Sequence, residues 1–289
     1  MTQKIDAEKK LIQRHFNDKA SVYESSAILQ REVGQRMLER LDYVALKPDV
    51  ILDVGCGTGR GAQALMKRYR AAKTLAVDVS TGMLQQTRKN SSWWRKPSLI
   101  CGDAENLPVA DNSVDLVYSN LMLQWCAPEN VFSEFMRVLR PQGLLMFSTF
   151  GPDTLKELRH SWSQVDQQVH VNEFIDMHML GDALMQVGFA EPVMDMDMMR
   201  LTYQHALDVM HDLKAIGANT LRQRDHMGLV TRNKINRVCA AYECFRQDGV
   251  LPASFEVVYG HAWKSESRRK QTSSSEIHIP VDKIGHTKK

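Results

Sequence analysis

The chain has 289 residues, of which 43% are hydrophobic and 25% are charged, as is ordinary for a globular protein with one sizeable core. Its formal net charge of +3 belongs to residues 265–289, where six lysines and arginines stand against three acids. Because residues 1–264 then sum to zero, the basic balance gives no evidence for a nucleic-acid-binding core.

The N-terminal sequence MTQKIDAEKK contains no apolar stretch of the kind that a signal peptide needs, and its acidic residues are unusual for a transit peptide. No run elsewhere approaches the roughly 18 apolar residues that span a bilayer. The five cysteines lack metal-ligand spacing, which favours reduced thiols and no metal site. We therefore expect a cytoplasmic protein whose partners are neither nucleic acid nor membrane.

Apolar residues recur at steps of three and four over residues 6–45, which predicts an N-terminal helical lid, residues 1–45. Lys47 and Pro48 end that pattern. Five short apolar runs then alternate with helical segments, and this order predicts a doubly wound α/β fold with a mostly parallel sheet. The predicted strands are 50–54, 74–78, 98–101, 114–118 and 144–149, and the predicted helices between them are 60–70, 80–90 and 129–139.

The pattern changes after Gly151 and Pro152. Predicted helices cover 153–163, 178–187, 205–217 and 231–247, and predicted strands cover 193–203 and 255–263. The two late strands complete a predicted seven-stranded sheet, with a helical cap, residues 204–250, inserted between them. The predicted sheet domain is 46–203 and 251–264, and the Ser-rich, charged run 265–289 is predicted to be a disordered tail.

A glycine-rich loop, LDVGCGTG over residues 52–59, follows the first predicted strand. Glycines there let the backbone turn sharply and bring amide N–H groups close to an anionic ligand group at a helix N-terminus. Dinucleotide-binding proteins use G-x-G-x-x-G at the same place, so the loop alone leaves a dehydrogenase open. Here the run is G-x-G-x-G, and an acid, Asp53, stands two residues before the first glycine.

Acidic residues also end the next two predicted strands. Asp78 ends the second, where a carboxylate can accept hydrogen bonds from both hydroxyls of a ribose. Asp103 ends the third, where it can meet the exocyclic amine of an adenine. These positions favour a nucleoside-containing ligand at one edge of the sheet.

The segments LDVGCGTG, GDAENLP and LRPQGLLMFSTFG, with Asp78 between the first two, resemble the motifs of class I S-adenosylmethionine methyltransferases in their expected order. The resemblance implies S-adenosyl-L-methionine as the cofactor and S-adenosyl-L-homocysteine as its product. It places Gly55, Gly57 and Gly59 along the methionine portion, Asp53 near the amino group, Asp78 on the ribose and Asp103 near the adenine. It also implies cofactor contacts from Cys56, Val79, Ala104 and Asn120.

Further segments resemble one family within that class, the malonyl-[acyl-carrier-protein] O-methyltransferases of biotin synthesis. They are FNDKASVYE, NLMLQW, GPDTLKELR, VNEFIDMHMLGDALMQVGF and VVYGHAWK, and the similarity spans residues 10–264. This family implies methylation of the free carboxylate of a malonyl thioester, carried on the phosphopantetheine arm of acyl-carrier protein, to the ester that primes pimeloyl and biotin synthesis.

Several alternatives stay open at this point. The scaffold also suits methylation of another small carboxylic acid or of a quinone precursor, or a S-adenosylmethionine-binding assembly factor. The sequence does not distinguish acyl-carrier protein from coenzyme A as the malonyl carrier. Nor does it indicate the oligomeric state or the role of residues 265–289.

The acceptor chemistry suggests which residue types to look for. A carboxylate is ionised near pH 7 and can attack a methyl group without a general base, so we expect a clamp that holds it. Arg159 is the first candidate because a guanidinium fork fits a carboxylate, although it could instead pair with Glu157 or Asp153 on a solvated helix. Tyr23 is the second candidate, because its hydroxyl could reach the methionine carboxylate of the cofactor or the substrate; core packing is the alternative.

Substrate contacts are expected from two other places. Gln124 and Trp125 follow the fourth predicted strand and so face the ligand edge, although Trp125 could equally pack in the core. Arg222 and Arg224 belong to a stretch with five cations and one acid, which would suit an acidic carrier protein. A solvated helix face is the alternative for that stretch.

Overall fold

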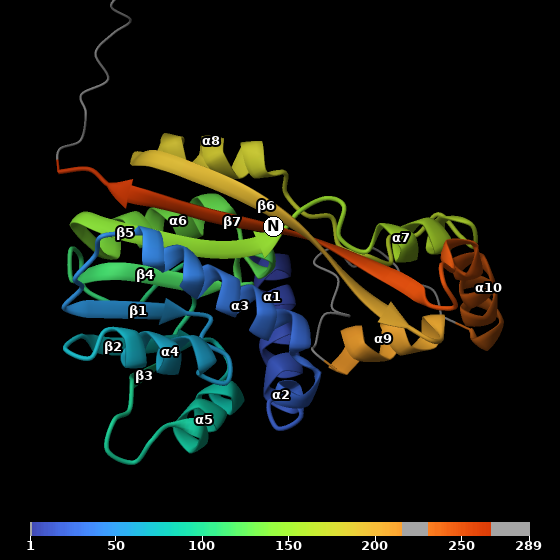
Figure 1. Ribbon diagram of the computed structural model, residues 1–289, viewed down its shortest axis with the longest axis horizontal. Helices are drawn as coiled ribbons and strands as arrows, with labels where there is room; N and C mark the ends of the chain where they lie inside the picture. The colour runs from blue at the N-terminus through green and yellow to red at the C-terminus, as the bar shows by residue number, and fades with distance from the viewer. Residues whose placement is uncertain (1, 216–230, 267–289) are drawn as a thin grey trace, which may run out of the picture.

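Seven strands form one sheet in the order β3-β2-β1-β4-β5-β7-β6 (Figure 1). This computed structural model describes residues 2–215 and 231–266. The strands are β1 (Val50–Val54), β2 (Lys73–Asp78), β3 (Ser98–Cys101), β4 (Val114–Asn120), β5 (Leu139–Phe150), β6 (Phe189–Tyr203) and β7 (Leu251–Lys264). The first five are parallel, and β7 runs antiparallel to both β5 and β6. The predicted doubly wound, mostly parallel seven-stranded sheet is confirmed.

Helices cover both faces of this sheet because its strands are apolar on both sides. The alternation is visible in β4, where Leu116 packs with α3 (Ile28–Arg40) and α4 (Arg60–Arg68). Its neighbour Val117 packs on the other side, with α6 (Pro128–Val138) and α8 (Met177–Val187). Helix α5 (Thr81–Asn90) joins the α4 side through Leu84, and Ser80 caps it by accepting a hydrogen bond from the Met83 N–H.

The N-terminal segment forms three helices, where the pattern had suggested continuous helix over 6–45. They are α1 (Thr2–Lys19), α2 (Tyr23–Ser26) and α3, followed by the 3-10 turn η1 (Leu41–Tyr43). Helix α1 docks on the start of α5, because Asn17 Oδ1 accepts hydrogen bonds from Ser80 Oγ and the Gly82 N–H, both at 2.8 Å. The contact holds α1 beside the carboxyl end of β2.

The second half of the chain builds a lobe around the far ends of β6 and β7 (Figure 1). It contains α7 (Lys156–Ser163), α9 (Ala206–Ala215) and α10 (Arg232–Tyr242), the last followed by the turn η3 (Glu243–Phe245). Helix α7 packs against α10 and β7, and the buried Glu157 accepts hydrogen bonds from the Ser254 hydroxyl and N–H. Residues 156–163 fall within the predicted sheet domain, and only the contacts of α7 show that it packs in this lobe.

Some element boundaries differ from the predicted ones. Helix α7 begins at Lys156 and not at 153, because Leu155 has a φ of +57° and interrupts the helical backbone. Strands β6 and β7 begin four residues before the predicted 193 and 255, since each pairs with the other along nearly its whole length. In the part of the chain that the structure describes, no helix is long and apolar enough to cross a membrane.

Strands β7 and β5 approach closely at Gly260, where the core has no room for a larger side chain. Gly260 lies opposite Phe147, and a Cβ there would overlap the Phe147 ring and stand 2.9 Å from Met194 Sδ. We predict that Gly260→Ala lowers the free energy of unfolding by about 1–3 kcal/mol, because the core must shift to accept the methyl group. Urea denaturation measures the change.

Gly181→Ala is the matched control, since a Cβ on this α8 residue would meet only Met194 Cγ, at 4.0 Å. We expect it to raise the free energy of unfolding by about 0.5–1 kcal/mol through helix propensity. Equal effects of the two substitutions would contradict the packing argument.

Candidate active site

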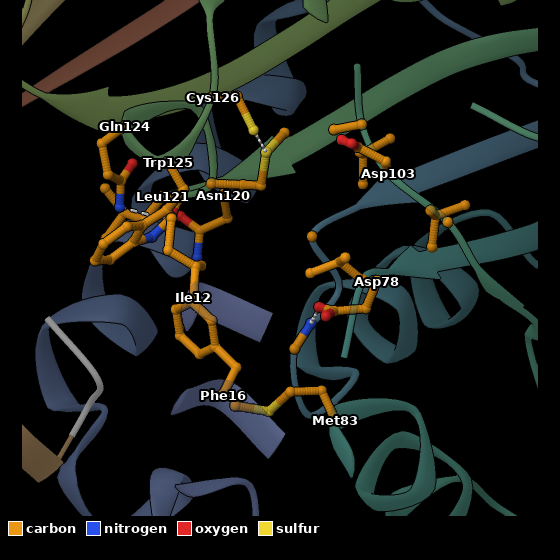
Figure 2. Close-up of a pocket in the computed structure, with 18 of the residues that line it drawn as sticks. Ile12, Phe16, Asp78, Met83, Asp103, Asn120, Leu121, Gln124, Trp125 and Cys126 are labelled. Carbon is orange, nitrogen blue, oxygen red and sulfur yellow. Dashed lines mark hydrogen bonds between the residues drawn. The ribbon is translucent and has the colours of Figure 1, made fainter. Parts of the chain in front are cut away.

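A cavity opens where the carboxyl ends of β1, β2, β3 and β4 meet the N-terminal helices (Figure 2). Ligand sites of doubly wound sheets lie at this edge. Ten of the residues predicted from the sequence line the cavity: Tyr23, Gly55, Gly57, Asp78, Val79, Asp103, Ala104, Asn120, Gln124 and Trp125. A second, more open hollow adjoins it and is lined by Asp53 and Cys56. The two hollows share Tyr23, Gln30, Gly55, Gly57 and Asn120.

Two glycines of the loop after β1 have different physical roles. Gly57 has a φ of +54° and its Cβ position faces open space, so its backbone forms part of the wall of both hollows. Gly59 has a φ of +86°, and a Cβ there would overlap Thr87 of α5. Gly59 lines neither hollow, so the structure shows it as a packing position at the start of α4.

Asp78 ends β2 with a buried carboxylate that is fixed by backbone donors. Its Oδ2 accepts from the Gly57 N–H at 2.9 Å and its Oδ1 from the Ser80 N–H at 2.8 Å. Burial raises the pKa of Asp78 to about 6, although both N–H groups favour the charged form. Each carboxylate oxygen keeps a further lone pair for a ligand hydroxyl.

Asp53 is buried in β1 beneath the glycine loop. Burial raises its pKa to about 7; the Ala62 N–H opposes this rise and the charge of Asp78 adds to it. Its Oδ2 atom is buried without a hydrogen-bond partner in the described structure. A buried acceptor of this kind is costly unless a ligand supplies a donor.

Asp103 stands at the other end of the cavity, paired with the lid. Lys9 Nζ of α1 lies 2.7 Å from Asp103 Oδ2 and 3.1 Å from Glu105 Oε2. Asp103 Oδ1 accepts from the Glu105 N–H at 2.9 Å. Lys9 is the one cation among the described residues that line this cavity, and its two acidic partners already neutralise its charge.

Aromatic rings cover the cavity on the lid side. Phe16 of α1 meets Trp125 edge to face with ring centroids 5.6 Å apart (Figure 2). The ring centroid of Tyr23 lies 6.4 Å from that of Phe16. Burial, and then the nearby charges of Asp78 and Glu24, raise the pKa of Tyr23 well above its usual value. The phenol is therefore a neutral hydrogen-bond donor at any physiological pH.

Asn120 and Gln124 are held by polar contacts behind the cavity wall. Asn120 Oδ1 accepts from Ser148 Oγ at 2.8 Å, and its Nδ2 donates to the Gln30 carbonyl at 3.0 Å. Gln124 Nε2 donates to the Leu121 carbonyl at 2.7 Å. Both side chains are therefore positioned before any ligand binds.

Arg159 does not line either hollow. Its Nη1 donates to the Pro152 carbonyl at 2.9 Å and its Nη2 to the Thr154 carbonyl at 3.0 Å. Its Nε is buried and has no acceptor in the described structure. Arg222 and Arg224 lie outside the described residues.

Four residues of the N-terminal helices that line the cavity are not predicted from the sequence, namely Lys9, Ile12, Phe16 and Gln30. The first three are spaced by three and four positions, so they share one face of α1. The sequence shows this spacing, but it does not show whether that face of the helix packs on a sheet or lines a cavity.

Comparison with known proteins supports the fold. The family model for a methyltransferase domain matches residues 52–147. A putative methyltransferase from Bacillus halodurans superposes with a TM-score of 0.55 at 20% identity, covering 79% of this chain and 98% of its own. A chain from the complex of the Haloferax volcanii Trm112 activator with a putative methyltransferase gives 0.57 at 17% identity, covering 89% and 98%.

Curated relatives cover almost the whole chain. The malonyl-[acyl-carrier protein] O-methyltransferase of Gallionella capsiferriformans is 49% identical, over 90% of this chain and 92% of its own. The protein of the same name from a Methylovorus species is 48% identical over 90% of each chain, and that of Xylella fastidiosa is 45% identical over 94% of each. At this identity and coverage, the chain belongs to the malonyl-[acyl-carrier protein] O-methyltransferase family.

Proposed function

We propose that this protein transfers the methyl group of S-adenosyl-L-methionine to the free carboxylate of a malonyl thioester on acyl-carrier protein. The product is the malonyl methyl ester. The observation that carries the proposal is the match, over nine-tenths of the chain, to relatives named for this reaction. The two hollows support the proposal, since Asp53, Asp78 and Asp103 stand where the methionine, ribose and adenine portions of the cofactor would lie.

The residues present fit each portion of the cofactor. The unpartnered Asp53 Oδ2 suits the ammonium of the methionine portion, and the open space at Gly57 admits the chain beside it. Asp78 would bind the ribose hydroxyls, and Asp103 and Ala104 would lie at the adenine. Val79 and Asn120 line the same cavity, and Cys56 lines the hollow next to it. S-adenosyl-L-homocysteine, the product, would keep all these contacts.

The described side chains orient the reactants and exclude water. Bound S-adenosyl-L-methionine supplies an electrophilic methyl group on a positively charged sulfur. The carboxylate of the acceptor is already ionised, so no residue has to remove a proton. Tyr23, kept protonated, would donate a hydrogen bond to the methionine carboxylate of the cofactor or to the substrate. Phe16, Trp125 and Gln124 line the cavity and would exclude water from the reacting groups.

Arg159 remains our proposal for holding the acceptor carboxylate. Its buried Nε without an acceptor supports this role, because a carboxylate oxygen would satisfy it. The proposed docking of an acidic carrier protein on Arg222 and Arg224 is supported by the charge of that stretch alone.

A methyl-transfer assay tests the function directly. With labelled S-adenosyl-L-methionine, we expect base-labile label on malonyl-acyl-carrier protein and none on acetyl-acyl-carrier protein, which has no free carboxylate. Binding of the cofactor without transfer to the malonyl form would show that the acceptor is a different molecule.

Arg159→Ala tests the clamp. We expect kcat/KM for the malonyl thioester to fall about 10- to 100-fold, the worth of a hydrogen bond to a charged group, with cofactor affinity unchanged. Lys156→Ala is the control, because this exposed cation of the same helix pairs with Asp153. An unaltered rate in Arg159→Ala would exclude the role.

The raised pKa of Asp53, about 7, predicts how cofactor affinity depends on pH. Lowering the pH protonates this carboxyl and removes the charge that attracts the ammonium, so affinity falls with falling pH. Between pH 8 and 6 we expect the Kd of S-adenosyl-L-homocysteine to rise about tenfold in titration calorimetry. Asp53→Asn should bind weakly and lose most of this dependence, and an unchanged slope would contradict the assignment.

A further inference from the structure

Two buried acceptor atoms beside the glycine loop lack hydrogen-bond donors. One is Asp53 Oδ2, and the other is Oε1 of Gln30 on α3. Both residues line the second hollow, and Gln30 also lines the main cavity. Since buried polar atoms in native proteins are nearly always paired, two orphaned acceptors on one hollow point to a missing group with several donors.

The position of Gln30 is fixed by contacts between α3 and β4. Asn120 Nδ2 donates to the Gln30 carbonyl at 3.0 Å, and one turn later the Tyr118 hydroxyl donates to the Gly34 carbonyl at 3.2 Å. A Cβ on Gly34 would stand only 3.1 Å from Asn120 Nδ2, so the glycine allows this close approach. The backbone of Gln30 is thus held at the wall that the two hollows share.

The chemistry of the missing donor follows from the kind of acceptors. A carboxylate oxygen and an amide oxygen both accept, so a group that satisfies the two must donate at least two hydrogen bonds, and a cation suits the carboxylate best. In the proposed cofactor only the ammonium of the methionine portion meets both conditions. The adenine amine belongs near Asp103, which lines the main cavity and not the second hollow.

We infer that Gln30 recognises the amino-acid end of the cofactor by accepting a hydrogen bond from its ammonium, in the hollow that Asp53 also lines. The inference rests on the proposed use of S-adenosyl-L-methionine. A neutral amide is well suited to this place, because a further carboxylate would add repulsion to the buried pair Asp53 and Asp78. Gln30 is therefore a specificity residue, separating the intact cofactor from nucleosides that lack the ammonium.

Three ligands and one substitution test the inference by calorimetry. Gln30→Met keeps the length and helix propensity of the side chain and removes the acceptor. S-adenosyl-L-homocysteine carries the ammonium and a carboxylate, decarboxylated S-adenosylmethionine carries the ammonium alone, and 5′-methylthioadenosine carries neither. We expect the Kd of the first two to rise about tenfold and that of the third to stay within about twofold.

Gln85→Met, on the exposed face of α5 and outside both hollows, is the matched control and should bind all three ligands like the parent. Equal weakening of all three by Gln30→Met, or of none, would overturn the assignment to the ammonium. Thermal unfolding of the ligand-free variants shows whether either substitution disturbs the fold. If the parent protein binds none of the three ligands, the proposed cofactor is wrong, which is a different outcome from the failure of Gln30.

Discussion

A parallel sheet brings the carboxyl ends of its strands to one edge, and the acids of this site stand where that edge puts them. Asp78 ends β2, Asp103 follows β3, and Asp53 lies one residue before the end of β1. The glycine turn completes the arrangement, because the Gly57 N–H reaches Asp78 Oδ2 across the top of the two strands. This bond ties the loop that would hold one end of the ligand to the carboxylate that would hold its middle.

The burial of these acids is what gives the site its electrostatic character. Burial raises the pKa values of Asp53 and Asp78 to about 7 and about 6, and no cation among the described residues acts on either carboxyl to oppose that rise. A ligand with a sulfonium and an ammonium relieves that situation by supplying charge and donors together. The same reasoning explains why a neutral glutamine suits the role that we infer for Gln30 better than another buried carboxylate would.

Helix α1 is attached to this edge by several polar contacts. Lys9 pairs with Asp103, Asn17 accepts from the first turn of α5, and Gln13 Nε2 donates to the Val79 carbonyl at 2.7 Å. Such contacts exchange with water at modest free-energy cost, whereas α3 is anchored by fully buried Val33 and Met37. The N-terminal segment therefore combines a firmly packed α3, which carries Gln30, with an α1 that adds exchangeable polar bonds to the apolar contacts of Ile12 and Phe16.

The sequence by itself determined the sheet domain and the part of the site that is local to it. Strand and helix periods, the glycine run and the acids at strand ends are short-range features, so the positions of Gly57, Asp78 and Asp103 could be predicted without coordinates. Only the tertiary structure decided which helix faces meet the cavity and where α7 packs. It also showed that the absence of a side chain at Gly59 allows the close approach of Thr87, and that Arg159 donates to backbone carbonyls. In addition, it showed that the side-chain oxygen of Gln30 accepts no hydrogen bond from the residues that the structure describes. These outcomes depend on contacts between residues distant in the chain, and a local pattern contains no information about which distant groups will be its neighbours.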